Sequence, residues 1–395
     1  MKCIFCEEEL TDRTKPEHVL LACLGGRKST RRVDCSKHNE AFGSTIDDEI
    51  ASQVRVIRNL LELESGTGNL APGLQNIKAG NETFNFDNEG NPTLVGAKPF
   101  TVTKLPDGST NIQVMATSVD HLNKLIPNIA AAAKLPEDEV RRLLKGSKPT
   151  FVSRRPGTVH HSLSFGGPEA LRSVAKSALV LWTLAAGNEE VRSDAYAEAR
   201  QFVLSGGDFN ARRMKLDSRP IPGTDALVDR FGKFFNLLYV ASDANGRVVG
   251  HFTLYNMVGW QMVLAERGGP PNLKIGLINN PLEPKDWSDT IADENVVPFD
   301  WLNNPTYVDD FVRARQRVTN MLEKHVEDAR SEEWERIIRQ VFEKHGIVKG
   351  SAVTDPTIIS QIYGEAAHRI AMHAHNIPYS EELTLEQIER MMAGK

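Results

Sequence analysis

Two short pairs of metal-binding side chains lie near the N-terminus, and they limit how this segment can fold. Cys3 and Cys6 form the first pair, and Cys35 and His38 form the second pair at the same spacing. Thiolates and an imidazole in two such pairs are typical ligands of a structural zinc ion. We therefore expect the four residues to bind one Zn²⁺, which would join the ends of a segment too short to build a core alone.

The positions of the cysteines favour a metal site over disulfide bonds. The chain has 4 cysteines, and all of them precede residue 36. A disulfide framework would spread its cysteines along the whole chain, and a reducing compartment would keep the thiols free. Cys23 belongs to neither pair, so we expect it to be a small buried residue.

The composition is that of a globular protein with enough apolar residues for several cores. Of the 395 residues, 40% are hydrophobic and 25% are charged. This length predicts about two or three domains. No uninterrupted apolar run reaches the roughly eighteen residues that a membrane helix needs. The first residues, Met1-Lys2-Cys3, lack the apolar core of a signal peptide, so we expect a cytoplasmic protein without a membrane partner.

One local group of cations stands out against a net charge of -5. It lies between the two ligand pairs and consists of Arg27, Lys28, Arg31 and Arg32. Cations beside a metal site can hold phosphate groups, so we expect these four to bind nucleic acid. The alternative is a solvated loop that is merely rich in charge.

Further motif residues occur in a fixed order around the ligand pairs. They are Glu17-His18, Gly25-Gly26, Asn39 directly after the last ligand, Gly43 and Asp47. With the runs CIFC, EHVLLACLGG, CSKHN and FGSTID, the segment resembles the zinc-ribbon type of HNH endonuclease, one of the ββα-metal or His-Me finger nucleases. The resemblance is confined to this N-terminal segment, and the remainder of the chain resembles no family that we recognise.

The resemblance implies a second metal site, which cuts nucleic acid. His18 would be the general base that activates water against a phosphodiester. Glu17 and Asn39 would hold one divalent ion, Mg²⁺ or Mn²⁺. Asp47 or Asp48 would reach the same ion or orient one of its ligands.

Three positions differ from the usual family pattern. His38 replaces a fourth cysteine, and its imidazole could bind either the zinc or the catalytic ion. Thr30 stands where the middle Asn of the HNH motif is expected, and Leu21 stands where a Pro is usual. None of these differences removes a catalytic group.

Hydrophobic periodicity predicts an α+β, multidomain chain. We divide it into a zinc-binding HNH module (1–64), a linker (65–80), a mixed α+β region for regulation or substrate recognition (81–305) and a helical C-terminal region (306–395). Expected helices cover 47–63, 119–145 with a restart at Pro136, 168–187, 193–204 and much of the tail, with breaks near Gly346 and Pro356. Expected strands are 84–86, a hairpin around Pro106–Gly108, 150–165 and a three-stranded meander within 231–265.

These patterns predict a metal-dependent endonuclease that hydrolyses phosphodiester bonds, in DNA, with a C-terminal region for recognition or control in restriction or antiphage defence. The alternative is a non-catalytic, zinc-stabilised nucleic-acid-binding module or a regulatory subunit of a larger assembly. Cutting both strands of a duplex needs two sites or two events, so we expect a homo-oligomer or a partner protein. The stripe Val312, Val318, Leu322 and Val326 could form the contact, or it could pack on its own domain.

Overall fold

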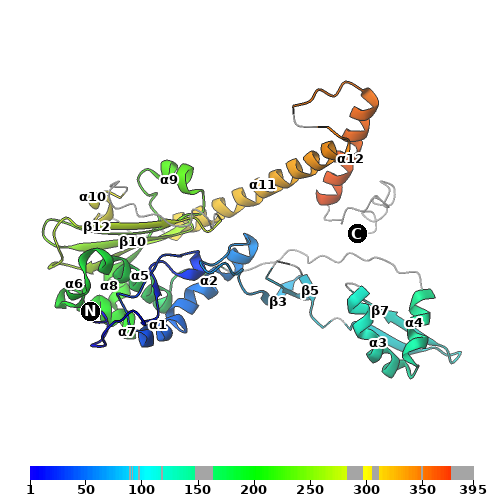
Figure 1. Ribbon diagram of the computed structural model, residues 1–395, viewed down its shortest axis with the longest axis horizontal. Helices are drawn as coiled ribbons and strands as arrows, with labels where there is room; N and C mark the ends of the chain where they lie inside the picture. Colours follow the sequence, from blue (N-terminus) through cyan, green and yellow to red (C-terminus); the bar gives the residue numbers. More distant parts are fainter. Residues whose placement is uncertain are drawn as a thin grey trace. The chain divides into compact units, whose positions relative to one another are not determined.

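The computed structural model describes residues 1–88, 90, 92–96, 98–116, 119–146, 163–282, 297–304, 311–347 and 350–374. The chain is a mixture of helices and sheets, which confirms the predicted α+β class (Figure 1). It forms two compact units. The first comprises Met1–Leu74, Asp87–Asn91 and His161–Glu335, and the second comprises Gln75–Phe86, Pro92–His160 and Arg336–Lys395.

The N-terminal part of the first unit is a small β-hairpin followed by two helices. Its elements are β1 (Glu17–His18), the 3-10 helix η1 (Ala22–Leu24), β2 (Ser29–Thr30), α1 (Ser36–Gly43) and α2 (Ile46–Leu60). The two strands are antiparallel, with Glu17 opposite Thr30 and His18 opposite Ser29. The sequence order of strand, strand and helix therefore gives the ββα arrangement that the motif predicts.

Helix α2 carries the apolar stripe that the sequence shows. Ile50, Val54, Ile57 and Leu61 are buried at helical spacing. After α2, the chain stays attached to this helix: Arg58 donates hydrogen bonds to the carbonyls of Leu63 and Asn69. Residues 65–73 thus lie against α2, and the next residues form β3 (Leu74–Ala79). The proposed division into modules and linker stays a prediction.

A five-stranded antiparallel sheet forms the centre of the first unit, in the order β12-β9-β10-β11-β8. The strands are β8 (Met214–Asp217), β9 (Asn236–Ser242), β10 (Val248–Leu254), β11 (Val258–Ala265) and β12 (Lys274–Asn279). Strands β9 to β11 confirm the expected meander. Side chains alternate between the faces, so Leu238 and Val240 join one core while Leu237 and Tyr239 join the other.

Helices cover both faces of this sheet (Figure 1). On one face lie α5 (Pro168–Ala186), α6 (Asn188–Arg192), η2 (Asp194–Tyr196), α7 (Ala197–Ser205) and α8 (Phe209–Arg213). On the other lie α9 (Thr224–Phe231) and α10 (Phe299–Leu302). The expected helix 168–187 is α5, which starts with Pro168 and stops at Gly187, where φ is +89°. Most of α5 is buried, because it packs on α2 as well as on the sheet.

The second unit contains two small groups of elements. One has a three-stranded sheet, β3-β4-β5, and a hairpin, β6-β7, with α3 and α4. Their bounds are β4 (Glu82–Phe86), β5 (Pro92–Leu94), β6 (Phe100–Lys104), β7 (Thr110–Val114), α3 (Val119–Ala133) and α4 (Glu137–Gly146). They confirm the expected strand, hairpin and divided helix.

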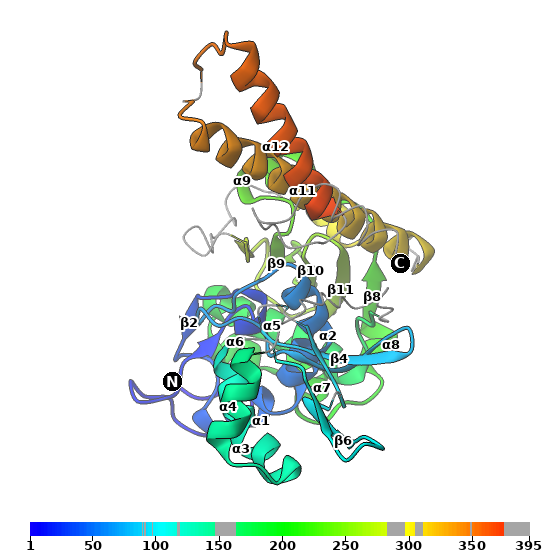
Figure 2. The ribbon, with the colours of Figure 1, turned by 90° about the vertical axis from the view of Figure 1, so that its right-hand side faces the viewer.

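The other group consists of two long helices. Helix α11 (Phe311–Lys344) contributes its residues up to Glu335 to the first unit, and α12 (Pro356–Ala374) packs on its C-terminal end (Figure 2). The described part of the tail is therefore helical and interrupted near Gly346 and Pro356, as predicted, while residues 305–310 and 375–395 lie outside the described residues. Val318 and Leu322 pack against the main core, whereas Val312 is exposed. The side chain of Val326 and most of the expected strand 150–165 lie outside the described residues. No described helix combines the length and the apolar composition needed to cross a membrane.

Candidate zinc centre and nuclease site

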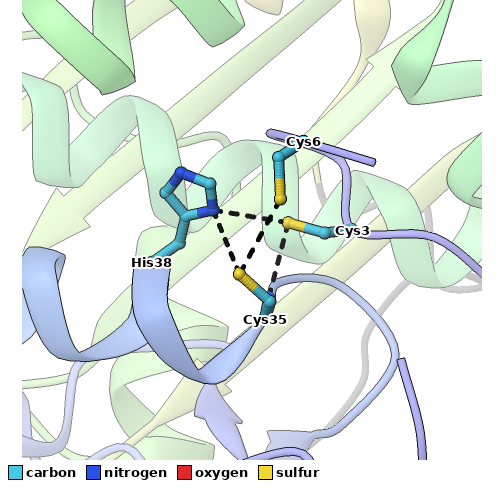
Figure 3. Close-up of side chains that lie close together, drawn as sticks. All are labelled: Cys3, Cys6, Cys35 and His38. Carbon is cyan, nitrogen blue, oxygen red and sulfur yellow. Dashed lines mark hydrogen bonds between the residues drawn. The ribbon is translucent and has the colours of Figure 1, made fainter. Parts of the chain in front are cut away.

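The four predicted zinc ligands meet at one point (Figure 3). Sγ of Cys3, Cys6 and Cys35 and Nδ1 of His38 all lie within 4.8 Å of one another. The Cys6–Cys35 sulfur distance is 3.9 Å, and Nδ1 of His38 lies 3.6 Å from Cys3 Sγ and 3.2 Å from Cys35 Sγ. In a tetrahedral zinc site with Zn–S bonds of about 2.3 Å, two sulfur ligands lie about 3.8 Å apart. The arrangement therefore fits a closed, structural zinc site.

The backbone around Cys3 favours a thiolate that is bound to a cation. The N–H groups of Phe5 and Cys35 both point at Cys3 Sγ, at 3.4 Å each. Burial raises the pKa of the Cys3 thiol to about 12. A buried thiolate therefore needs a positive partner, and a zinc ion would supply it. His38 is held in place by Phe5 and Phe42, whose rings contact the imidazole.

The zinc centre positions the predicted nuclease residues, because Asn39 follows His38 on α1. Nδ2 of Asn39 donates a hydrogen bond to Oε2 of Glu17 at 2.6 Å and another to the carbonyl of Pro16 at 3.2 Å. Glu17 is buried on β1, directly before His18. The structure thus brings Glu17 and Asn39 together beside His18.

His18 is only partly buried, and its surroundings disfavour the imidazolium form. Burial lowers the pKa of His18, and the positive charge of Lys176 lowers it further, while the backbone of Gly26 and the charge of Asp47 act in the opposite direction. Nδ1 is buried and has no hydrogen-bond partner of good geometry. A neutral imidazole is the form that a general base needs.

Gly25 and Gly26 stand at positions where a larger residue would not fit the backbone. A Cβ atom on Gly26 would lie 1.9 Å from the carbonyl oxygen of Leu20, and a Cβ atom on Gly66 would lie 1.8 Å from the carbonyl oxygen of Gly26. Gly25 has a φ of +84°, a conformation that favours glycine. Gly25 and Gly26 therefore let the chain after β1 turn back tightly, and Gly66 lets residues 65–68 approach this turn.

Lys176 on α5 joins this site, although it lies outside the sequence motif. Its Nζ lies 2.6 Å from Oε1 of Glu17 and 2.5 Å from Oδ2 of Asp47, and its side chain is fully buried. Burial alone would lower the pKa of Lys176, but the carboxylates of Asp47 and Glu17 outweigh it and raise the pKa. The signal available in the sequence is a single cation within the apolar run Val174–Trp182.

Asp47 is held by α5, and the next helical turn of α5 supplies its second contact. Ser173 donates a hydrogen bond to Oδ1 of Asp47, while Lys176 contacts Oδ2. Asp48 is exposed on α2. A further carboxylate, Asp34, is almost completely buried and neither of its oxygens has a hydrogen-bond partner. Burial, followed by the nearby charge of Glu17, raises the pKa of Asp34 to about 8.

The four basic residues flank β2. Arg27 and Lys28 precede the strand and are half-buried, and Arg31 and Arg32 follow it and are exposed. Arg31 donates a hydrogen bond to the carbonyl of Thr14. The cations therefore lie on the hairpin whose first strand carries His18.

The donor atoms of Glu17 and Asn39 fit a hard divalent cation, since a carboxylate and an amide oxygen are ligands that Mg²⁺ and Mn²⁺ accept. Both oxygens of Asp47 have donors on α5, and both oxygens of Glu17 have donors as well, Asn39 and Lys176, so an ion would have to displace one of these contacts. Within the described part of the chain, no third His, Cys or carboxylate joins Glu17 and Asp47 at metal-ligand spacing.

Comparison with known proteins agrees with this geometry. Residues 3–55 match the family model of HNH endonucleases. The match covers the zinc ligands, β1, β2, α1 and most of α2, so the resemblance read from the motif is confirmed for this HNH segment. Neither the curated proteins nor the solved structures gave a match to the chain.

The HNH segment is fixed to the rest of the first unit through its backbone carbonyls. Asn188 donates hydrogen bonds to the carbonyls of Lys2 and Arg32, at 3.0 and 2.7 Å. Asn236 and Asn279 both donate to the carbonyl of Leu24, at 2.9 and 3.1 Å. These bonds add to a continuous apolar core that includes residues of α2, α5 and the sheet.

Proposed function

We propose that this protein is a metal-dependent endonuclease that hydrolyses phosphodiester bonds in DNA, with the HNH segment as its catalytic part. The observation that carries the proposal is the contact between Asn39 and Glu17, made directly beside His18 on a hairpin anchored by the zinc ligands. A structural zinc site alone would need neither this contact nor His18.

In the proposed reaction, His18 accepts a proton from the water that attacks the phosphorus atom. Glu17 and Asn39 would hold the catalytic ion, Mg²⁺ or Mn²⁺. When bound, this ion would neutralise charge on the scissile phosphate and on the leaving oxygen. The lowered pKa of His18 keeps the imidazole ready to accept the proton at neutral pH.

Substrate binding falls to the cations around β2. Arg27, Lys28, Arg31 and Arg32 would contact phosphates on either side of the cleaved bond. The larger part of the chain would recognise the substrate or control the site, as a restriction or antiphage system requires, and a second copy or a partner protein would supply the second cut. The alternative is a non-catalytic nucleic-acid-binding module or regulatory subunit, and one observation favours it: Lys176 already neutralises Glu17.

A cleavage assay tests the proposal. Wild-type protein and His18→Ala are incubated with plasmid, linear duplex, single-stranded DNA and RNA, with Mg²⁺ or Mn²⁺ present. We expect the wild type to cut DNA and the variant to lose on the order of a hundredfold or more in rate, with DNA affinity retained. His121→Ala, on α3, is the control and should cut normally. A His18→Ala variant that cuts as fast as the wild type would reject His18 as the general base, and a wild type that binds DNA without cutting it would favour the binding module.

A further inference from the structure

Every oxygen of the Glu17–Asp47 carboxylate pair already has a hydrogen-bond donor. Asn39 and Lys176 donate to the two oxygens of Glu17, each at 2.6 Å. Ser173 and Lys176 donate to the two oxygens of Asp47. The ammonium group of Lys176 therefore bridges both carboxylates and takes the place that a cation shared by them would occupy.

The burial of Lys176 makes this bridge important for stability. The side chain of Lys176 has an exposed fraction of 0%, and that of Glu17 has 5%. A buried ammonium is stable only with negative partners close to it, so Lys176 cannot leave both carboxylates for solvent without cost. The side chain of Asp47 is 17% exposed, which places this carboxylate at the outer end of the bridge.

A divalent ion on Glu17 would meet the ammonium group at close range. Like charges repel strongly where water is excluded, because the local dielectric constant is low. Ion and ammonium therefore compete for Glu17, even if the ion binds through the oxygen that faces Asn39. Asp47 gives the lysine a second partner that remains when Glu17 is taken.

We propose that Lys176 is a built-in competitor for the catalytic ion at Glu17, and that Asp47 is the residue that keeps the ammonium group when the ion binds. This inference rests on the proposed function, because it concerns the same metal site. It makes Lys176 a positioning residue, supplied by a helix far from the HNH segment in sequence. By thermodynamic reciprocity, ion binding then weakens the contact between α5 and β1 by the same factor that the contact weakens ion binding.

The test measures Mn²⁺ affinity in the full-length, zinc-loaded protein without nucleic acid, by electron paramagnetic resonance of free Mn²⁺. Lys176→Met keeps the length of the side chain and removes its charge, and we expect it to bind Mn²⁺ at least tenfold more tightly than the wild type. Lys15→Met is the matched control. Lys15 is exposed and its charge also acts on Glu17, but it does not contact that carboxylate, so we expect a much smaller gain.

Two further measurements keep the outcome clear if Lys176→Met folds poorly. The double variant Lys176→Met with Asp47→Asn removes the ammonium group and the carboxylate that it contacts, and it should show the same gain in Mn²⁺ affinity. In the wild type, saturating Mn²⁺ should speed hydrogen exchange of the α5 amides around Lys176. Folded variants that bind Mn²⁺ no more tightly than the wild type would overturn the inference, and so would unchanged exchange at saturation. Tighter Mn²⁺ binding without DNA cleavage would reject the nuclease proposal and leave the role of Lys176 standing.

Discussion

Nζ of Lys176 lies 2.6 Å from Oε1 of Glu17, although the two residues are 159 positions apart. The HNH segment is therefore completed by a helix from another part of the chain. Breaking such a contact leaves a buried charge without its partner, which is far more costly than losing an exposed ion pair. The candidate nuclease site and the core of the first unit accordingly depend on each other.

The first prediction concerns the zinc site. Purified wild-type protein should carry about one zinc ion per chain. Cys35→Ser should lose this zinc and melt at a lower temperature, because three remaining ligands cannot close the tetrahedron. Cleavage should fall as well, since Asn39 follows the ligand His38 on α1. Elemental analysis measures the zinc content, thermal melting measures the stability, and the plasmid assay measures cleavage.

Cys23→Ser is the control for this experiment. Cys23 lies outside the ligand cluster, so its variant should keep the zinc. A Cys35→Ser protein that retains a full zinc content would show that the ion is held elsewhere.

The second prediction concerns the glycine pair. Gly26→Ala should lower the free energy of unfolding by about 1–3 kcal/mol, because the new methyl group would collide with the backbone of Leu20. The affected turn follows β1, so DNA cleavage should also decline. Chemical denaturation and the plasmid assay are the measurements.

Gly43→Ala provides the contrast. Gly43 belongs to the same motif and ends α1, but a Cβ atom there would have no neighbour within 4 Å. We expect unchanged stability or a gain of up to about 1 kcal/mol. Equal losses in the two variants would argue against a steric role for Gly26.

The zinc ligands and the hairpin of the ββα motif could be predicted from sequence because their defining residues are close together, whereas α1 (Ser36–Gly43) was not among the expected helices. Each ligand pair is on one local turn, and Asn39 is next to a ligand. The meander was equally accessible, since a turn rich in Asp, Asn and Gly separates two apolar runs. Local patterns of this kind are reliable because few other backbone conformations satisfy them.

Lys176 could not be assigned by such patterns, because its partners come from β1 and α2. The sequence shows only a lysine among apolar residues, and that pattern names no partner. Strands β8 and β12 were missed for a related reason. Both are short, and they lie at the two edges of the sheet, where they are defined by pairing with β11 and β9 rather than by their own alternation.

The third prediction concerns acid stability and Asp217 on β8. Burial would raise the pKa of Asp217, but the hydrogen bonds from Arg219, together with the His251 imidazole whose Nδ1 lies 3.4 Å from Oδ2, outweigh burial and hold this pKa below its usual value. A carboxylate with a lowered folded-state pKa stabilises the protein above its unfolded pKa of about 3.9. This contribution is lost as the pH falls through the folded-state value.

Asp217→Asn should therefore cost about 3–5 kcal/mol at neutral pH, the range for breaking a buried ion pair. The difference from the wild type should narrow as the pH falls below about 4. Asp208→Asn is the matched control, because Asp208 also pairs with an arginine but is exposed, and its effect should be much smaller. Urea denaturation at several pH values measures the difference. If the difference in unfolding free energy between Asp217→Asn and the wild type stayed constant down to low pH, the ion pair of Asp217 would not be the source of that difference.

The last prediction concerns the cations around β2. For duplex DNA, the slope of log affinity against log salt concentration falls by about 0.9 for each phosphate contact that is lost. Arg27→Gln and Arg32→Gln should each reduce the slope by up to this amount, and their effects should add. Arg31 is a poorer choice, because it also donates a hydrogen bond to the carbonyl of Thr14 and its loss could disturb the fold.

Fluorescence anisotropy with a labelled duplex, over a series of salt concentrations, gives the slope directly. Arg267→Gln removes an exposed charge from the loop between β11 and β12, away from β2 in the sequence, and should leave the slope unchanged. His18→Ala should also bind with the wild-type slope, since its role is chemical. If Arg27→Gln and Arg32→Gln behave like Arg267→Gln, the group is a solvated loop, and the phosphate contacts must come from another surface.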